Sequence, residues 1–133
     1  MGHSQPLRLK VLVVDDDPSV LEVTAELLSA EGHEVLRAAT AREALAHLET
    51  HRDIDLLFTD IVLSGPMDGF DLAETAKRRR PGLHVIYTSG YLKDEGVWEG
   101  TLLTKPWTED DLRGAIADLY QSIRPTARYG RSS

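Results

Sequence analysis

The sequence has no cysteine, and aromatic residues make up only 6% of its 133 positions. Without cysteine, disulfide bridges and cysteine-ligated structural zinc are both excluded, so a hydrophobic core has to hold the fold together. A domain of this length typically buries about 68–70% of the surface that its unfolded chain exposes, which is enough for a core of its own. The length therefore predicts one domain, with little room for a second.

Long apolar runs and an excess of basic residues are also absent. No apolar run approaches the ~20 residues of a membrane span, and the N-terminus lacks the charged and apolar regions of a secretory signal peptide. The chain has 22 acidic and 15 basic side chains and a net charge of -7. Nucleic-acid and anionic-membrane binders depend on clustered Lys and Arg, which argues against both classes. We expect a soluble, cytoplasmic protein that neither binds nucleic acid directly nor inserts into a membrane.

Five short apolar runs alternate with longer amphipathic stretches along the chain. The runs, which predict strands, cover residues 9–14, 34–38, 55–59, 83–88 and 101–104. Three of them are nearly continuous Val, Leu, Ile, Phe and Tyr, as is typical of strands buried on both faces of a parallel sheet. Helical spacing and capping residues predict helices at residues 18–30, 40–51, 69–80 and 108–123. The pattern predicts a five-stranded, doubly wound α/β domain with helices on both faces of the sheet.

Two parts of the chain depart from this alternation. Residues 89–100 hold three glycines, so we expect at most one or two helical turns there and hence a shortened fourth helix. Residues 1–7 and 124–133 are predicted to be loose ends, the second of them basic, around a domain that spans residues 8–123.

Polar residues follow the predicted strands. Three aspartates at residues 15–17 come after the first strand, Asp60 follows the third, and Thr88 closes the fourth. Lys105 comes directly after the fifth strand. In open parallel sheets, ligand sites form outside the carboxyl ends of the strands. If the strand order brings these ends together, several carboxylates, a hydroxyl and an ammonium converge there.

Such a cluster suits phosphoryl chemistry on a carboxylate. Neighbouring carboxylates repel one another unless a cation compensates them, and Mg2+ prefers carboxylate oxygens with positions left open for phosphoryl oxygens. Asp15, Asp16 and Asp60 match that preference. Lys105 and Thr88 match the charge and the hydrogen-bond donor that a transferring phosphoryl group needs.

Taken singly, these residues have plainer interpretations. Asp17 precedes Pro18 and is predicted to be a helix N-cap. Asp15 fits a solvated loop acid, Thr88 an ordinary β-branched strand residue, and Lys105 an ordinary surface lysine. Their shared position at strand ends is what favours a site.

The motifs at four strand ends resemble those of response-regulator receiver domains. They are Val-Leu-Val-Val-Asp-Asp-Asp-Pro at 11–18, Leu-Phe-Thr-Asp at 57–60 with Met-Asp-Gly at 67–69, Val-Ile-Tyr-Thr-Ser-Gly at 85–90, and Lys-Pro-Trp at 105–107. Each motif is weak alone, but four in this order, over nearly the whole chain, are highly specific. The resemblance implies a flavodoxin-like receiver that takes a phosphoryl group from a histidine kinase phosphohistidine onto an aspartate, using Mg2+.

The resemblance also implies a role for each matching acidic position. It makes Asp60 the phosphoacceptor and a metal ligand, and it makes Asp15 and Asp16 the acidic pair that binds Mg2+. The main-chain carbonyl of Val62, two positions after the acceptor, is implied as a further metal ligand.

Two further positions are implied to meet the phosphoryl group itself. Thr88 matches the hydroxyl that contacts the group and shifts on activation, and Lys105 matches the invariant ammonium. The peptide bond between Lys105 and Pro106 is expected to be cis, which a residue other than proline would make costly.

The chain departs from the usual receiver pattern in two regions. Leu102 stands where receivers usually carry the switch aromatic of the fifth strand, and the segment 89–104 is shorter than usual. Both departures affect the usual output face, built from the fourth helix, fifth strand and fifth helix; Tyr91 is either a replacement for the moving aromatic or a loop tyrosine. The loop at 64–67 reads Ser-Gly-Pro-Met, differs from the usual Met-Pro-Gly pattern and is one residue longer.

Three functions stay open at this point. The leading one is a phosphorylatable signalling switch, which catalyses only its own phosphorylation and dephosphorylation. A rival is a haloacid-dehalogenase-like phosphatase, which uses an aspartate nucleophile in an Asp-x-Asp motif; residues 15–19 approximate that motif. In that family the last pair of acidic residues in the site, its closing pair, should follow a strand, whereas Asp110 and Asp111 open a helix. The third is a degenerate receiver that binds partners without phosphorylation, which the retained site residues disfavour.

The leading function implies protein partners. They are a sensor histidine kinase or a phosphotransfer protein, and an unidentified downstream protein target, with a homodimer as a further option. About ten residues follow a receiver that ends near residue 123, so we expect no attached output domain and either a stand-alone receiver or one excised from a hybrid kinase.

Overall fold

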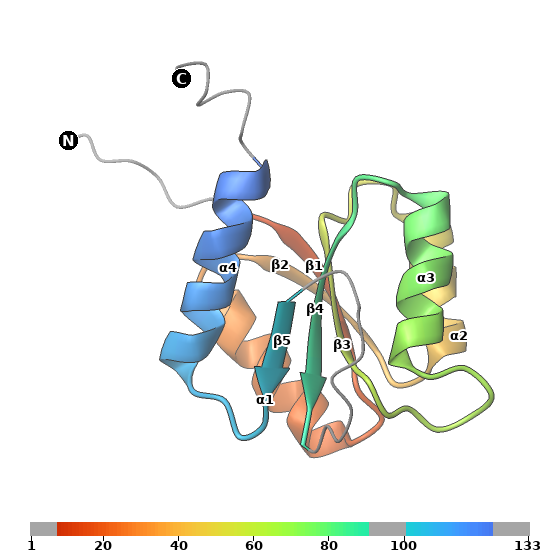
Figure 1. Ribbon diagram of the computed structural model, residues 1–133, viewed down its shortest axis with the longest axis horizontal. Helices are drawn as coiled ribbons and strands as arrows, with labels where there is room; N and C mark the ends of the chain where they lie inside the picture. The colour runs from red at the N-terminus through yellow and green to blue at the C-terminus, as the bar shows by residue number, and fades with distance from the viewer. Residues whose placement is uncertain (1–7, 91–100, 124–133) are drawn as a thin grey trace.

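The computed structural model describes residues 8–90 and 101–123, with side chains to residue 119, and contains one parallel sheet in the order β2-β1-β3-β4-β5 (Figure 1). The strands are β1 (Lys10–Val14), β2 (Glu34–Ala38), β3 (Leu56–Asp60), β4 (His84–Ser89) and β5 (Thr101–Thr104). The helices are α1 (Pro18–Ala30), α2 (Ala41–Thr50), α3 (Gly69–Arg79) and α4 (Glu109–Ile123). The predicted five-stranded, doubly wound sheet is confirmed. The short helix expected between β4 and β5 and the loose ends expected at 1–7 and 124–133 lie outside the described residues.

Side-chain caps fix where the helices begin. Asp17 accepts hydrogen bonds from the N–H groups of the first turn of α1, as predicted, with Pro18 at the first helical position. At the start of α4, the Asp111 N–H donates to Thr108 Oγ1 at 3.0 Å and the Thr108 N–H donates to Asp111 Oδ2 at 2.9 Å. This reciprocal pair is a capping box. No helix in the described part of the chain is both long and apolar enough to cross a bilayer.

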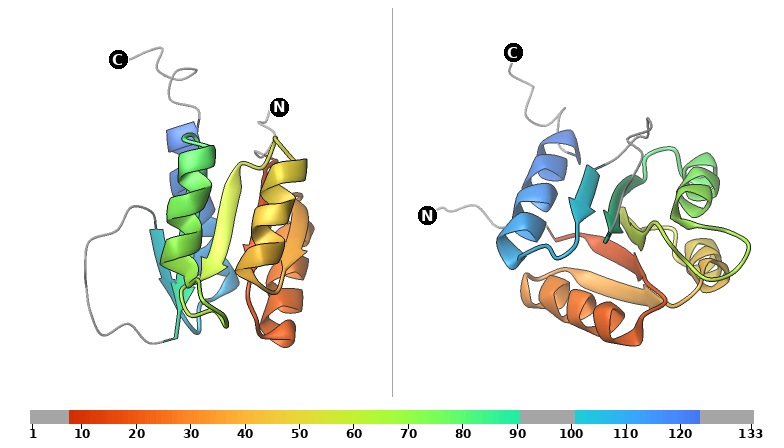
Figure 2. Two further views of the ribbon diagram at one scale, coloured as in Figure 1. Left: turned by 90° about the vertical axis from the view of Figure 1, so that its right-hand side faces the viewer. Right: turned by 60° about the horizontal axis from the view of Figure 1, so that its bottom comes forward.

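Side chains alternate along the strands between two hydrophobic layers, one on each face of the sheet. One layer packs α2 and α3 against residues such as Leu57 and Val85. The other packs α1 and α4 against residues such as Phe58 and Ile86. The right-hand view of Figure 2 shows the two helix pairs on opposite sides of the sheet. Because both faces are covered, β3 is buried along its whole length, which explains its continuous apolar sequence.

Gly69 opens α3 where the chain passes very close to the end of β3. A Cβ atom at this position would clash with the carbonyl oxygen of Asp60 and would lie 2.8 Å from the Cα atom of Ile61. The Gly69 N–H donates to the Ile61 carbonyl at 2.7 Å. Asp68 and Asp71 form a capping box just beside it. The loop that leaves the sheet at Asp60 is therefore fastened back onto the same strand.

Replacing Gly69 by alanine should lower the free energy of unfolding by about 2–3 kcal/mol, because backbone atoms of β3 cannot move aside for the new Cβ. Urea denaturation followed by circular dichroism measures the change. Gly114 in α4 is the matched control, since its Cβ would point into open space. Gly114→Ala should stabilise the chain by roughly 0.5–1 kcal/mol, and equal losses in both variants would contradict the close approach at Gly69.

The buried His33 joins the turn after α1 to the chain entering β1. Its Nδ1 atom accepts a hydrogen bond from the Leu9 N–H at 3.0 Å, and the residue is 9% exposed. Burial lowers the pKa of His33 below its ordinary value, against the opposing charge of Glu31. An imidazole nitrogen accepts a hydrogen bond only when it carries no proton, so protonation of Nδ1 breaks this contact.

The free energy of unfolding is therefore expected to fall as the pH drops below about 6.5, where the unfolded chain binds a proton that folded His33 resists. The fall ends once the pH passes the lowered pKa of the folded state. His84, whose pKa burial also lowers, acts in the same direction. His33→Asn keeps an acceptor and does not titrate, so its urea midpoint should fall less than that of the wild type between about pH 7 and pH 5. If the urea midpoints of the wild type and His33→Asn fell equally, His33 would not contribute to the pH dependence of stability.

Candidate functional site

The strand order places the carboxyl ends of β1, β3 and β4 side by side (Figure 1). Asp60 ends β3 and pairs in register with Thr88 of β4. Asp15 and Asp16 follow β1, and Lys105 directly follows β5. The strand ends that carry these residues therefore lie together at one end of the sheet.

The ammonium group of Lys105 contacts two carboxylates. Its Nζ atom lies 2.8 Å from Asp60 Oδ2 and 3.4 Å from Asp15 Oδ2. The side chains of Asp15 and Asp60 are only 5% and 11% exposed, so solvent screens these charges weakly. Burial lowers the pKa of Lys105, but the hydrogen bond to Asp60 and the charges of both carboxylates outweigh burial and leave that pKa above its ordinary value. Lys105 is therefore charged at neutral pH.

Backbone N–H groups hold the other oxygen of each carboxylate. The Val62 N–H donates to Asp60 Oδ1 at 3.0 Å, and the Asp17 N–H donates to Asp15 Oδ1 at 2.9 Å. Burial raises the pKa of Asp15; the Asp17 hydrogen bond and the charge of Lys105 oppose the rise, and the charge of Asp60 adds to it. One ammonium group thus compensates the two carboxylates incompletely.

Asp16 has a different partner. Both the N–H and the hydroxyl of Ser64 donate to Asp16 Oδ2, at 3.0 Å and 2.6 Å. Both residues are exposed, in contrast to Asp15 and Asp60. Ser64 is not among the predicted site residues, and its one sequence signal is the unusual loop in which it lies.

The remaining predicted residues are positioned by backbone contacts. Thr88 is 2% exposed, and its carbonyl accepts the Ile61 N–H at 2.9 Å. The Lys105 N–H donates to the Ser89 carbonyl at 2.8 Å, and the peptide bond between Lys105 and Pro106 is cis, as expected. These contacts continue the strand pairing into the site, so the hydroxyl of Thr88 and the ammonium of Lys105 are placed by the sheet itself.

The oxygen ligands at this end of the sheet suit Mg2+. They are carboxylate and carbonyl oxygens, the hard ligands that Mg2+ prefers. Asp15 and Asp60 together carry more negative charge than Lys105 compensates. Within residues 8–90 and 101–119, no three acidic or histidine side chains converge as a ready metal cluster, and Asp16 accepts its hydrogen bonds from the loop through Oδ2. The ligand set therefore stays a prediction; its members are Asp15, Asp16, Asp60 and the Val62 carbonyl.

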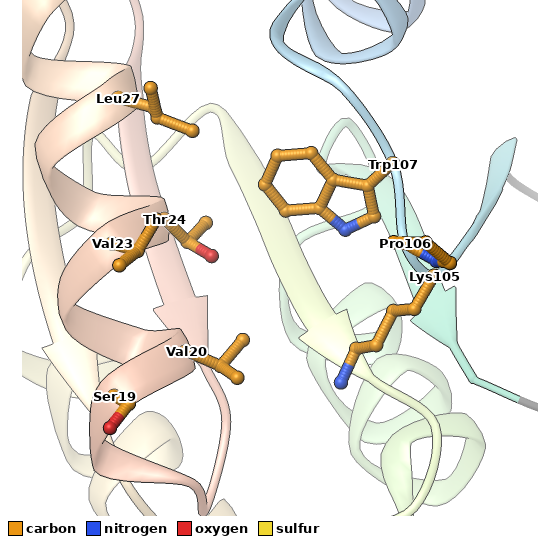
Figure 3. A pocket seen from close by; sticks show the side chains of 8 residues that line it. All are labelled: Ser19, Val20, Val23, Thr24, Leu27, Lys105, Pro106 and Trp107. Carbon is orange, nitrogen blue, oxygen red and sulfur yellow. The ribbon is translucent and has the colours of Figure 1, made fainter.

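An apolar pocket lies beside Lys105, between α1 and the residues that follow β5. Figure 3 shows Val20 and Leu27 of α1 across the pocket from Trp107, with the Lys105 side chain extending beside them. The Trp107 ring also packs edge-on against Phe58, with ring centroids 5.8 Å apart. Trp107 is therefore part of the domain and forms one wall of this pocket.

The aromatic side chain usual on the fifth strand of receivers is missing, as the sequence indicates. Leu102 occupies that place, half-buried against the layer that contains α2 and α3. It pairs in register with Tyr87 of β4, whose ring lies 5.0 Å from that of Phe70. The candidate replacement, Tyr91, lies outside the described residues.

Comparison with known proteins identifies related chains. The nitrogen assimilation regulatory protein NtrX of Azorhizobium caulinodans is 30% identical, over 92% of this chain and 31% of its own length. The transcriptional regulatory protein GlrR of Escherichia coli is 33% identical, over 94% of this chain and 28% of its own. The chain thus spans less than a third of the length of these two relatives.

Solved structures and a family model agree with these relatives. A CheY-like response regulator receiver domain protein from Methanospirillum hungatei superposes with a TM-score of 0.80 at 33% identity, covering 90% of this chain and 99% of that one. The model of the response regulator receiver domain matches residues 11–117, a range that includes every predicted site residue and all five strands except the first residue of β1. The chain therefore belongs to the response regulator receiver domain family of two-component signalling.

Proposed function

We propose that this chain accepts a phosphoryl group on Asp60 from the phosphohistidine of a sensor histidine kinase or a phosphotransfer protein, with Mg2+ as cofactor. The observation that carries the proposal is the 2.8 Å contact between Asp60 Oδ2 and the Lys105 ammonium at the carboxyl end of the sheet. A fixed positive charge beside the accepting carboxylate is what a transferring phosphoryl group requires. Membership in the receiver family supports the same assignment.

The transfer would use side chains that lie at the carboxyl end of the sheet. A carboxylate oxygen of Asp60 attacks phosphorus in line, the P–N bond to the donor histidine breaks, and its electron pair returns to the imidazole. Lys105 compensates charge on the phosphoryl oxygens, and the hydroxyl of Thr88, next to Asp60 in the sheet register, donates to one of them. The Val62 N–H keeps the Asp60 side chain in position. Bound Mg2+ would supply further charge compensation between the carboxylates and the phosphoryl oxygens.

The phosphodonor would approach across an apolar surface next to the site. Val62, in the loop after β3, is 68% exposed, and Val23 of α1 is 54% exposed. Val23 also lines the pocket that Trp107 borders. Two large apolar side chains exposed on elements that adjoin the site favour contact with another protein there. We therefore assign the donor protein to the surface formed by α1 and this loop.

Phosphorylation is proposed to act as a switch rather than as a step in product turnover. A shift of Thr88 toward the phosphoryl group would move the end of β4, and Thr88 pairs in register with Leu103 of β5. The event at Asp60 would thereby bias the conformation of the sheet edge, which a downstream protein or a second copy of the chain then recognises.

The rival phosphatase function fits this geometry less well. Its closing acidic pair should follow a strand, whereas Asp110 and Asp111 lie in the first turn of α4. The Asp111 carboxylate caps that helix, and Asp110 Oδ1 accepts a hydrogen bond from Arg113 at 2.7 Å. Both residues are therefore engaged in local contacts of the helix. The degenerate receiver is disfavoured because Asp15, Asp60 and Lys105 are all retained and Lys105 contacts both carboxylates.

Asp60→Asn should abolish covalent labelling by acetyl phosphate in the presence of Mg2+, because the amide is not a nucleophile for phosphorus. Intact mass spectrometry, followed by peptide mapping, locates the adduct. Asp118→Asn on the exposed face of α4 is the matched control and should label like the wild type. Label that persists at another residue in Asp60→Asn would contradict the acceptor assignment, rapid turnover through Asp15 would support the phosphatase, and an unlabelled wild type would support the degenerate receiver.

Asp15→Asn should raise the free energy of unfolding at neutral pH in EDTA, because it removes a buried charge whose pKa is raised by burial. The amide oxygen can still accept the Asp17 N–H, so the local turn is retained. The wild type should lose stability as the pH rises through that elevated pKa, and the variant should not. Excess Mg2+ should raise the midpoint of the wild type more than that of Asp15→Asn. Equal Mg2+ effects would remove Asp15 from the ligand set.

A further inference from the structure

The loop between β3 and α3 holds Asp16 from across the site. Ser64 donates two hydrogen bonds to the same oxygen, Asp16 Oδ2, from its N–H at 3.0 Å and from its hydroxyl at 2.6 Å. The two residues are 48 positions apart in the sequence. Hydrogen bonds to a charged group are shorter and stronger than neutral ones, and two on one oxygen fix the direction of the carboxylate. Asp16 is thus oriented although it is exposed.

The loop itself is fastened so that Ser64 stays in this place. At its start, the Ile61 N–H donates to the Thr88 carbonyl at 2.9 Å, and at its end the Gly69 N–H donates to the Ile61 carbonyl at 2.7 Å. Gly65, directly after Ser64, has a φ angle of 101°, which favours glycine over any other residue. The loop that carries Ser64 is therefore anchored at its start to β4 and closed at its end onto Ile61, the residue after β3.

This pair of donors depends on the identity of residue 64. Residues 64–67 read Ser-Gly-Pro-Met, which differs from the Met-Pro-Gly pattern usual in the receivers that this chain resembles. Proline has neither an N–H nor a hydroxyl, so it offers Asp16 no hydrogen bond. The two hydrogen bonds to Asp16 therefore need a residue with both an N–H and a hydroxyl at position 64.

We propose that Ser64 is a positioning residue for Mg2+ binding, which holds Asp16 by Oδ2 so that Oδ1 is presented to the cation. This inference rests on the proposed function. Among the described residues, Ser64 is the hydrogen-bond partner of Asp16 and it uses Oδ2, so Oδ1 carries no hydrogen bond there. The cation and Ser64 therefore use different oxygens and do not compete. Hydrogen bonds to a metal-ligating carboxylate orient it and raise the affinity of the site.

The test compares the Mg2+ dissociation constants of the chain and its variants, measured by Mg2+ titration followed through amide chemical shifts. Ser64→Ala removes the hydroxyl and should raise the dissociation constant roughly tenfold, the lower end of such effects. Ser64→Thr keeps a hydroxyl and should restore most of the affinity. Ser29→Ala, on the exposed face of α1, is the matched control and should bind Mg2+ like the wild type.

A double-mutant cycle separates positioning from a general disturbance of the loop. In an Asp16→Ala background, Ser64→Ala should change the Mg2+ affinity no further, because the residue through which it acts is gone. A loss that persists in that background overturns the proposal, and so does an unchanged or tighter dissociation constant for Ser64→Ala alone. In those cases, Mg2+-dependent labelling at Asp60 in the wild type leaves the proposed function standing. A wild type that binds no Mg2+ overturns the proposed cofactor, and this inference with it.

Discussion

The position of the Lys105 ammonium is the constraint on which the site depends. Two carboxylates at the ends of neighbouring strands, both largely buried, repel each other unless a positive charge lies between them. Lys105 supplies that charge to Asp60 at 2.8 Å and to Asp15 at 3.4 Å, from 45 and 90 positions away in the sequence. It reaches them because β5 pairs with β4 and β4 with β3, all parallel and ending at the same side. The order of the whole sheet therefore allows two acidic side chains to be buried close together.

Compensation by Lys105 is incomplete, and this shapes what the site can bind. The pKa of Asp15 stays raised, with burial as its main cause, although an ammonium group lies beside it. A second cation placed near the carboxylates would relieve the remaining repulsion. Asp16 contributes less to this repulsion, because it is exposed and its carboxylate accepts hydrogen bonds from Ser64. Asp15 and Asp60 thus set the charge of the site, whereas the loop sets the direction of Asp16.

The fold was predictable from the sequence because its signals are local. Apolar runs match strands that both helix layers cover, and residues such as Asp17 and Thr108 cap the helices within three positions of themselves. The site was predictable only as a set of strand ends, since the register that pairs Asp60 with Thr88 follows from the sheet order. Ser64 was not, because a polar loop residue gives no sign of a partner 48 positions away. His33 was missed for the same reason, since its contact with Leu9 joins two segments by a single hydrogen bond.

The backbone contacts at the strand ends also limit how a change at Asp60 can travel. Thr88 is tied on one side to Ile61, the residue after Asp60, and the next residue, Ser89, accepts the N–H of Lys105. A displacement of Thr88 therefore acts on the loop of Ser64 and on the start of the Lys105 turn at once. On β5, Leu102 has no aromatic ring that could change its position when Thr88 moves. The loop after β3, whose Ile61 is bonded to Thr88, and the turn after β5, whose Lys105 is bonded to Ser89, are consequently the direct routes by which phosphorylation would reach a partner. Both border the surface assigned to the phosphodonor.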